Sequence, residues 1–262
     1  MNYFDAHTHV QFDSYDVDRD SLLMRMREAG VGGLVVGVDL ESSRRALAIA
    51  EREEHLYASV GLHPNHADEL EDFSLYQELA RHPKVVAIGE CGLDNYRPLD
   101  AAGAAPRQRE VFEKHVELAL ELDKPLMIHA RPRKGTHDAY HELLEILGRY
   151  KQEFGEKLRG DIHFFVGGIE EARQFVEIGF TCSFTAVLTF THDYDEVVRY
   201  LPLASILSET DAPYIAPASR RGERNDPFSV QDVVSAIARI RGEDEEVVRQ
   251  ALVSNAMALF RL

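Results

Sequence analysis

Cysteine is scarce in this sequence, and long apolar stretches are missing from it. The 262 residues include only two cysteines, Cys91 and Cys182, which are far apart and show no Cys-x-x-Cys spacing. This argues against a disulfide framework and against a thiolate zinc site. The longest apolar stretches, such as residues 31–38, have the length of a strand. They fall far short of the roughly 20 residues that a membrane-spanning helix needs, so we expect no membrane segment.

Targeting signals and positive charge are also lacking. The N-terminus has no basic segment followed by an apolar one, so we expect no secretion and a cytoplasmic protein. Lys and Arg number 29 against 45 Asp and Glu, which gives a net charge of −16. Such a chain repels a polyanion at long range, and a nucleic-acid partner would have to be held by a local basic patch or by metal ions. No low-complexity linker divides the sequence, and we expect one domain over residues 1–262.

What the sequence does contain is a regular alternation of short β-like segments with helix-length amphipathic segments. This alternation predicts parallel strands joined by right-handed crossover helices. The expected strands are Tyr3–Thr8, Gly33–Val38, Tyr57–Gly61, Val85–Gly89, Pro125–Ile128, Asp161–Phe164, Thr181–Phe184 and Ser205–Ser208. Eight strands in a chain of this length predict an α/β fold, a (β/α)8 TIM barrel.

Two helices are especially clear from their apolar spacing. One follows Pro106 and places apolar side chains at positions 112, 116, 119 and 120. The other follows Ser229, which we expect to cap the helix N-terminus, and ends before Gly242.

Histidines and carboxylates recur where the expected strands end. In a TIM barrel these C-terminal strand ends face the catalytic mouth. The residues at or just after them are His7, His9, His63, Glu90, His129, His163, Glu209 and Asp211. Any one of these histidines could be an ordinary core residue, but the combined nitrogen and oxygen donors suit zinc, manganese or another divalent cation.

The first and fourth strands carry the most informative donors. His7 and His9 point to one face because strand side chains alternate, so both imidazoles can reach one ion. Glu90 stands at the end of its strand between glycines that let the backbone turn, and its carboxylate can bridge two cations. In many related barrels that bridge is a carbamylated lysine, but Lys84 and Lys124 precede their strands and lie at the opposite end.

The last strand and the third supply further candidates. Glu209 and Asp211 are two residues apart and are expected on one side, with Asp211 deepest in the site by analogy with single-aspartate metal barrels. Asp211 can bind metal and accept a proton from the attacking water. His63 is expected to contact substrate or donate to a leaving group, with the capping of a turn as the alternative. No role is expected for His55, His82, His115, His137, His141 and His192, which fall in helical segments or polar loops where exposure is usual.

These segments together resemble the TatD-like deoxyribonucleases, which are metal-dependent hydrolases with TIM-barrel folds. The resemblance runs along the whole chain and rests on the segments at 5–9, 61–64, 89–94, 108–112, 128–131, 209–214, 221–225, 255–256 and 259–260. It implies metal-ligand positions for His7, His9, Glu90, His129, His163 and Asp211, with His63 and Glu209 as additional site residues. The sequence departs from the family pattern after His129 and after His163, and both departures bear on substrate preference.

The resulting functional prediction is a hydrolase with two divalent metal ions (Mg, Mn or Zn) that hold a water for attack on a DNA phosphodiester, trimming single-stranded ends. A collar for the DNA phosphates is predicted from Arg131, Arg133, Lys134, Arg220, Arg221 and Arg224, which follow the fifth and eighth strands. The alternative is a two-metal hydrolase of esters, amides or lactones, including an aminoacyl-tRNA deacylase, because the same water attacks a carbonyl carbon. A non-enzymatic binding module is the third possibility. We expect no membrane and no obligate protein partner.

Overall fold

The computed structural model describes residues 1–96 and 104–262. It holds one sheet of eight parallel strands, each paired with the next in chain order. The strands are β1 (Tyr3–Thr8), β2 (Val31–Val36), β3 (Leu56–Val60), β4 (Val85–Asp94), β5 (Leu126–Arg131), β6 (Gly160–His163), β7 (Phe180–Phe184) and β8 (Ile206–Ser208). Thr8 and Ala212 form a parallel bridge that joins the segment after β8 to β1. The prediction of a TIM barrel is confirmed.

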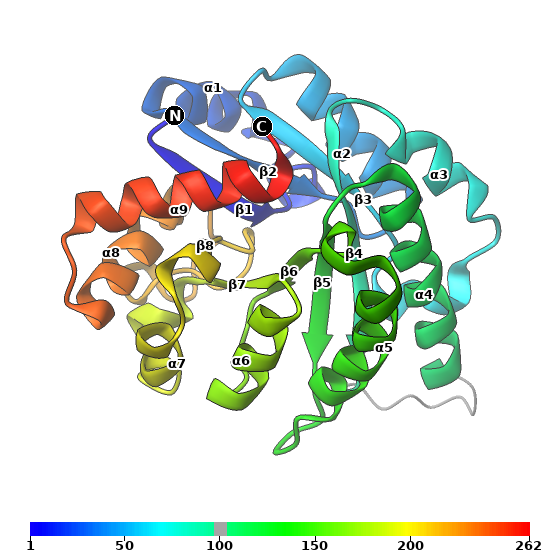
Figure 1. Ribbon diagram of the computed structural model, residues 1–262. Coiled ribbons are helices and arrows are strands. Elements are labelled where there is room, and N and C mark those ends of the chain that lie inside the picture. The colour runs from blue at the N-terminus through cyan, green and yellow to red at the C-terminus, as the bar shows by residue number, and fades with distance from the viewer. Residues whose placement is uncertain (97–103) are drawn as a thin grey trace.

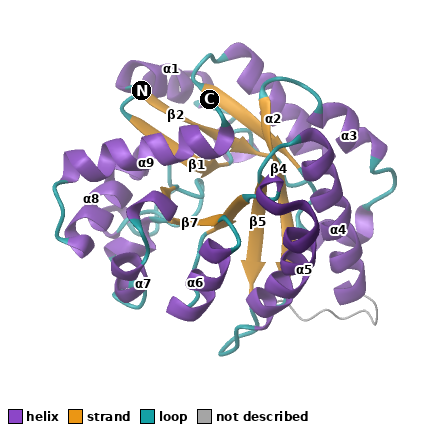
Figure 2. Ribbon diagram, in the orientation of Figure 1, coloured by secondary structure: helices purple, strands orange, loops and turns teal. Residues whose placement is uncertain are grey.

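Helices surround the sheet, as Figures 1 and 2 show. They are α1 (Arg19–Ala29), α2 (Leu40–Arg52), α3 (Ser74–Ala80), α4 (Ala104–Leu122), α5 (Asp138–Phe154), α6 (Ile169–Glu177), α7 (Asp195–Tyr200), α8 (Val230–Arg241) and α9 (Glu245–Phe260). Every residue of β2 is buried, as expected for a parallel strand that is covered on both faces. Among the described residues, no helix combines the length and the apolarity needed to cross a bilayer.

The strand β4 differs from its prediction, because it continues past Gly89 to Asp94. Its pairing with β5 shifts register between Ile88 and Cys91 and then resumes. Gly89 has φ +140°, and a Cβ at this position would lie 2.2 Å from the carbonyl oxygen of Met127. The glycine therefore allows an irregularity within the strand and does not end it.

The helix α8 ends at the predicted place but begins differently. Gly242 follows it with φ +67°, which is the usual left-handed C-terminal cap. The prediction that Ser229 caps the N-terminus is wrong, because its hydroxyl donates to Oδ1 of Asn225 at 2.5 Å. The capping carboxylate is three residues earlier, where Asp226 accepts from the backbone N–H of Phe228 at 3.0 Å and starts a 3-10 turn.

The two ends of the chain meet at one end of the barrel. The helix α9 crosses this end, and Figure 1 shows both termini beside it. The ring of Phe260 stacks on that of Phe4 with centroids 5.8 Å apart. Ala256 and Leu259 join the same buried cluster as Leu34, Met127 and Leu207 from the strands. This apolar packing leaves the opposite end, where the strands finish, to carry polar side chains.

Candidate metal centre

Two local irregularities bring donors of β1 and β4 into the barrel. The pairing of β1 with β2 shifts between Asp5 and Thr8, and that of β4 with β5 shifts just before Cys91. An extra residue in a strand changes the face to which the following side chains point. In a regular strand, residues three apart point to opposite faces. Phe4 and His7 are three residues apart, as are Ala87 and Glu90. The extra residue in each strand allows both members of each pair to face the interior.

On the other side of the barrel, the strands stay in register. His129 in β5 is the direct partner of His163 in β6. Asp211 lies beyond the end of β8 in a left-handed backbone conformation (φ 51°), and its N–H donates to the carbonyl oxygen of His7 at 2.9 Å. Donors from both ends of the sequence therefore meet at one mouth of the barrel.

The first group of possible ligands is His7, His9 and Asp211. The Nε2 atoms of the two imidazoles are 3.1 Å apart, and Oδ1 of Asp211 is 3.4 Å from Nε2 of His9. Asp211 is 9% exposed and is the shallower of the two carboxylates after β8, because Glu209 is fully buried. The expectation that Asp211 is the deeper residue is wrong, since the chain leaves the strand before reaching it.

The carboxylate of Glu90 lies between two sets of imidazoles. Its Oε2 is 3.5 Å from Nε2 of His7, on the β1 side. Its Oε1 is 2.9 Å from Nδ1 of His129 and 3.3 Å from Nε2 of His163, on the β5 and β6 side. Oε2 thus faces the imidazole from β1 and Oε1 faces those from β5 and β6. The rings of His7 and His163 stack with centroids 3.8 Å apart, and both belong with Glu90 to a second group of possible ligands.

A further group joins His63, Asp94 and His129. Nε2 of His63 is 3.2 Å from Nδ1 of His129, and Oδ2 of Asp94 is 3.3 Å from Nε2 of His129. Sequence reasoning missed Asp94, because the fourth strand was expected to stop at Gly89. The signal that could have found it is the alternation from Glu90 through Gly92 to Asp94, which places every second residue of a continued strand on one face.

His163 is held from behind by the carboxylate of Glu209. Its Nδ1 is 3.2 Å from Oε1 of Glu209, which also accepts the backbone N–H of Phe164 at 2.8 Å. The other oxygen of Glu209 accepts from the hydroxyl of Ser183 at 2.7 Å. Both oxygens of Glu209 therefore have partners within the protein, and the structure places this residue behind His163.

The protonation of the rings follows from these contacts. Nδ1 of His9 lies 2.9 Å from the carbonyl oxygen of Val36, to which it can only donate, so the neutral ring presents the lone pair of Nε2 to the mouth. His163 likewise presents the lone pair of Nε2 to the mouth, because its Nδ1 donates to Glu209. In His63 the two ring nitrogens exchange roles. Its Nδ1 accepts the N–H of Asn65 at 3.1 Å, which leaves the proton on Nε2.

This arrangement fits a divalent cation. Lone pairs of His9 and His163 face carboxylate oxygens at 3.4 and 3.3 Å, and two acceptors at such distances repel unless a positive charge lies between them. Burial alone would raise the pKa of Glu90, but the imidazoles around it, those of His63, His129 and His163, hold that pKa well below its usual value. A mixed imidazole and carboxylate set of this kind suits zinc or manganese.

The predicted phosphate collar divides into two classes. Arg133, Arg220 and Arg224 are already paired with Asp138, Asp226 and Asp18, at 2.7, 3.1 and 2.5 Å. Arg131 and Arg221 are exposed and stack on Tyr96 and Phe190, and Lys134 is exposed. Among the described residues no carboxylate pairs with these last three. The available positive charge is therefore about half of what the sequence suggests.

Lys84 and Lys124 lie away from the mouth, and one histidine for which no role was expected differs from its prediction. Nζ of Lys84 donates to the carbonyl oxygens of Glu53, Glu54 and Leu56, and Lys124 donates to backbone carbonyls where α3 ends, both at the opposite end of the barrel. The expectation that His115 is exposed is wrong. His115 is fully buried, where its Nε2 accepts the N–H of Leu62 at 3.1 Å and its Nδ1 donates to Val111 at 2.7 Å.

The comparisons with known proteins agree with this geometry. Residues 4–261 match the family described as TatD related DNase. The chain belongs to the TatD-related DNase family. It is 35% identical to the uncharacterized metal-dependent hydrolase YabD of Bacillus subtilis, with 99% of each chain covered. It is 31% identical to the 3'-5' ssDNA/RNA exonuclease TatD of Erwinia billingiae, again with 99% of each chain covered.

Solved structures support the same assignment. The TatD homologue YjjV of Escherichia coli K12 superposes with a TM-score of 0.88 at 29% identity and covers 98% of its own length and all of this chain. A dihydroorotase of Campylobacter jejuni, at 13% identity and a TM-score of 0.56, shares the fold alone. The chain is thus a metal-dependent hydrolase of that family.

Proposed function

We propose that this protein is a nuclease that hydrolyses phosphodiester bonds at single-stranded DNA ends with two divalent cations. One observation carries the proposal, namely that the two oxygens of Glu90 face different imidazoles, Oε2 that of His7 and Oε1 those of His129 and His163. Paired cations are a common solution for in-line phosphoryl transfer, because one stabilises the attacking oxygen and the other the leaving oxygen. The name of the Erwinia billingiae relative supports the same substrate class.

The side chains have different roles in the proposed reaction. His7, His9 and Asp211 would hold one cation. His129 and His163, which both lie near Oε1 of Glu90, would hold the other, and Glu90 would contribute to both. When bound, the cations would polarise the phosphoryl group and make a water at the site more acidic. Asp211 accepts the proton of the attacking water, because it lies at the exposed edge of the group.

His63 and Glu209 have supporting roles in the proposal. The neutral His63 directs Nε2–H into the site, where it can donate a hydrogen bond to a phosphate oxygen as charge builds up there. Glu209 orients the ring of His163 through Nδ1 and acts as a positioning residue, in the manner of carboxylates behind ligating histidines. Arg131, Arg221 and Lys134 contact the DNA backbone, while Arg133 and Arg224 stabilise their loops through ion pairs.

A substrate panel tests the function. The protein is reconstituted with Mg²⁺, Mn²⁺ or Zn²⁺ and assayed against labelled single-stranded DNA, duplex DNA and an acyl ester. We expect the single-stranded DNA to be shortened from an end and the ester to remain intact. If only the ester is hydrolysed, and Asp211→Asn abolishes that hydrolysis, the nuclease proposal is wrong and the carbonyl hydrolase is correct. Fewer than about one equivalent of bound cation after reconstitution would favour a binding module.

A further inference from the structure

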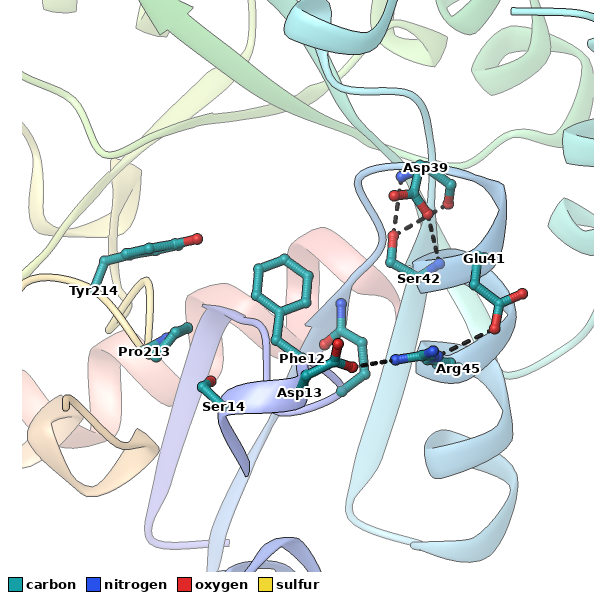
Figure 3. A pocket seen from close by; sticks show the side chains of 10 residues that line it. Phe12, Asp13, Ser14, Asp39, Glu41, Ser42, Arg45, Pro213 and Tyr214 are labelled. Atoms are coloured by element: carbon teal, nitrogen blue, oxygen red, sulfur yellow. Dashed lines mark hydrogen bonds and ion pairs between the residues drawn. The ribbon is translucent and has the colours of Figure 1, made fainter. Parts of the chain in front are cut away.

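A cavity of about 530 Å³ adjoins the metal centre. This volume lies within the range of about 300–1,000 Å³ that is usual for small-molecule sites. Figure 3 shows Phe12 and Tyr214 on one side of the cavity and Asp39, Glu41 and Arg45, from the start of α2, on the other. Its walls therefore combine aromatic rings with carboxylates.

His9 connects the cavity with the centre. The ring of Phe12 stacks on that of His9, with centroids 4.6 Å apart and planes 6° from parallel. Tyr214 meets the same imidazole edge-on at 6.4 Å, and its backbone N–H donates to the carbonyl oxygen of Asp211. A substrate group held by His9 and Asp211 would therefore lie next to the cavity.

The aromatic side suits the flat face of a nucleobase. Tyr214 is 53% exposed although the loop that carries it is tied to the centre, and Phe12 is half-buried beside it. Stacking on aromatic rings is the usual way in which proteins bind single-stranded nucleic acid, since every base has such a face.

The polar side selects for hydrogen-bond donors on the ligand. Gln11 lines the cavity and is 1% exposed; its Nε2 donates to Val36, while its Oε1 has no hydrogen-bond partner among the described residues. An unpaired buried acceptor is unfavourable, and a donor brought by a ligand would satisfy it. Asp13, Asp39 and Glu41 outnumber the single Arg45 in the lining, so a phosphate is repelled from this cavity.

We propose that this cavity binds the base of a nucleotide next to the scissile bond and prefers bases whose exocyclic amino group is at the position of adenine N6 or cytosine N4. Adenine and cytosine present such an N–H₂ donor, whereas thymine presents a carbonyl oxygen at the corresponding position. The proposal rests on the proposed nuclease function only for the statement that the phosphate lies at the metal centre. The binding of a base by Gln11, Phe12 and Tyr214 stands on the cavity itself.

A binding experiment tests the cavity without any turnover. The Mg²⁺-loaded full chain is titrated with dAMP, dCMP, dTMP and deoxyribose 5-phosphate, and binding is followed by saturation-transfer NMR. We expect dAMP and dCMP to bind about tenfold more tightly than dTMP, which corresponds to one good donor–acceptor contact. Equal affinities for all four compounds, or no saturation of base protons, would overturn the proposal.

Variants then locate the contact. Tyr214→Ala should lower the affinity for dAMP about tenfold relative to that for deoxyribose 5-phosphate, whereas Tyr214→Phe should retain the native ratio. Tyr200→Ala is the matched control, because Tyr200 on α7 is similarly exposed (49%) and lies outside the cavity. Gln11→Met should bring the ratio between dAMP and dTMP close to one. Unchanged ratios in both the Tyr214→Ala and Gln11→Met variants would place the base elsewhere.

Cleavage assays with matched oligonucleotides separate this inference from the proposed function. Oligonucleotides that differ only in the base beside the cleaved bond, including an abasic one, are compared by kcat/KM. If no oligonucleotide is cleaved, the nuclease proposal fails, and the NMR ratios still decide whether the cavity binds a base. If all oligonucleotides, the abasic one included, are cleaved equally and the mononucleotides bind equally, the nuclease proposal stands and the base-binding cavity does not.

Discussion

The two ends of this barrel differ in how their polar side chains are paired. At the end where the strands begin, Nζ of Lys84 donates to three backbone carbonyl oxygens at 2.9–3.1 Å. At the end where they finish, the lone pairs of His9 and His163 face the carboxylates of Asp211 and Glu90. Groups that are satisfied within the protein stabilise the fold, whereas groups that need something added are available for chemistry.

The largest effect expected from this comparison concerns Asp211 at the mouth. Asp211→Asn keeps the shape of the side chain but removes the charge and the proton acceptor, so we expect kcat to fall by about 10³-fold. Thermal unfolding should change little, because the residue is at the edge of the group. Asp193→Asn, an exposed change of the same chemistry, is the control. Native activity in Asp211→Asn would remove this residue from the catalytic machinery.

The buried His115 sharpens the comparison, because it is a histidine whose two ring nitrogens both have partners. Burial lowers its pKa from 6.5 to about 4. The unfolded chain therefore binds a proton between pH 6.5 and 4 that the folded chain does not, and stability falls as the pH drops through this window. The loss should reach about 3 kcal/mol at pH 4.

Urea unfolding between pH 7 and 4 measures this loss. His115→Gln keeps an acceptor for the N–H of Leu62 but cannot titrate, so its stability should depend less steeply on pH than that of the native protein. Parallel curves for the two proteins would show that other groups dominate acid unfolding.

A smaller effect is expected behind the mouth, at Glu209. Glu209→Gln removes the charge that faces Nδ1 of His163 and should weaken cation binding by about 10- to 100-fold. Competition with a fluorescent chelator measures this affinity, with the exposed Glu196→Gln on α7 as the control. Native affinity together with reduced activity would instead indicate a contact with the substrate.

The smallest effect is expected at the opposite end. Lys84→Met leaves three carbonyl oxygens without their donor and should cost about 1–3 kcal/mol of unfolding free energy. Activity at a temperature well below the transition should stay native. Lys114→Met, which removes only an exposed pair with Glu110, should cost less than about 1 kcal/mol. A loss of activity in Lys84→Met without a loss of stability would contradict the division between the two ends.

Much of the fold could be predicted from the sequence, because it depends on local patterns. Each of the eight strands was expected within a few residues of its observed place, since short apolar segments alternate with amphipathic ones along the chain. The exceptions depend on contacts with other elements. The continuation of β4 to Asp94 depends on how Gly89 packs against Met127, and the burial of His115 depends on Leu62 from another element.

In the candidate site, the place of the residues could be predicted from the sequence, whereas their contacts could not. The residues that meet at the mouth were expected there because they follow strand ends. Their individual contacts were not predictable, since the position of Glu209 behind His163 and the ion pairs of Arg133 and Arg224 join residues that are distant in sequence or separated by a loop. Asp94 was missed for the same reason as the end of its strand.

The bridge between Thr8 and Ala212, with Asp5 accepting both the N–H and the hydroxyl of Thr210, ties the earliest part of the polypeptide to one of its last segments. During translation, the segment with His7 and His9 emerges from the ribosome before Asp211 is synthesised. Until the final strand docks, a growing chain holds an incomplete set of donors. Unfinished translation products and truncated fragments should therefore lack the hydrolase activity of the full chain.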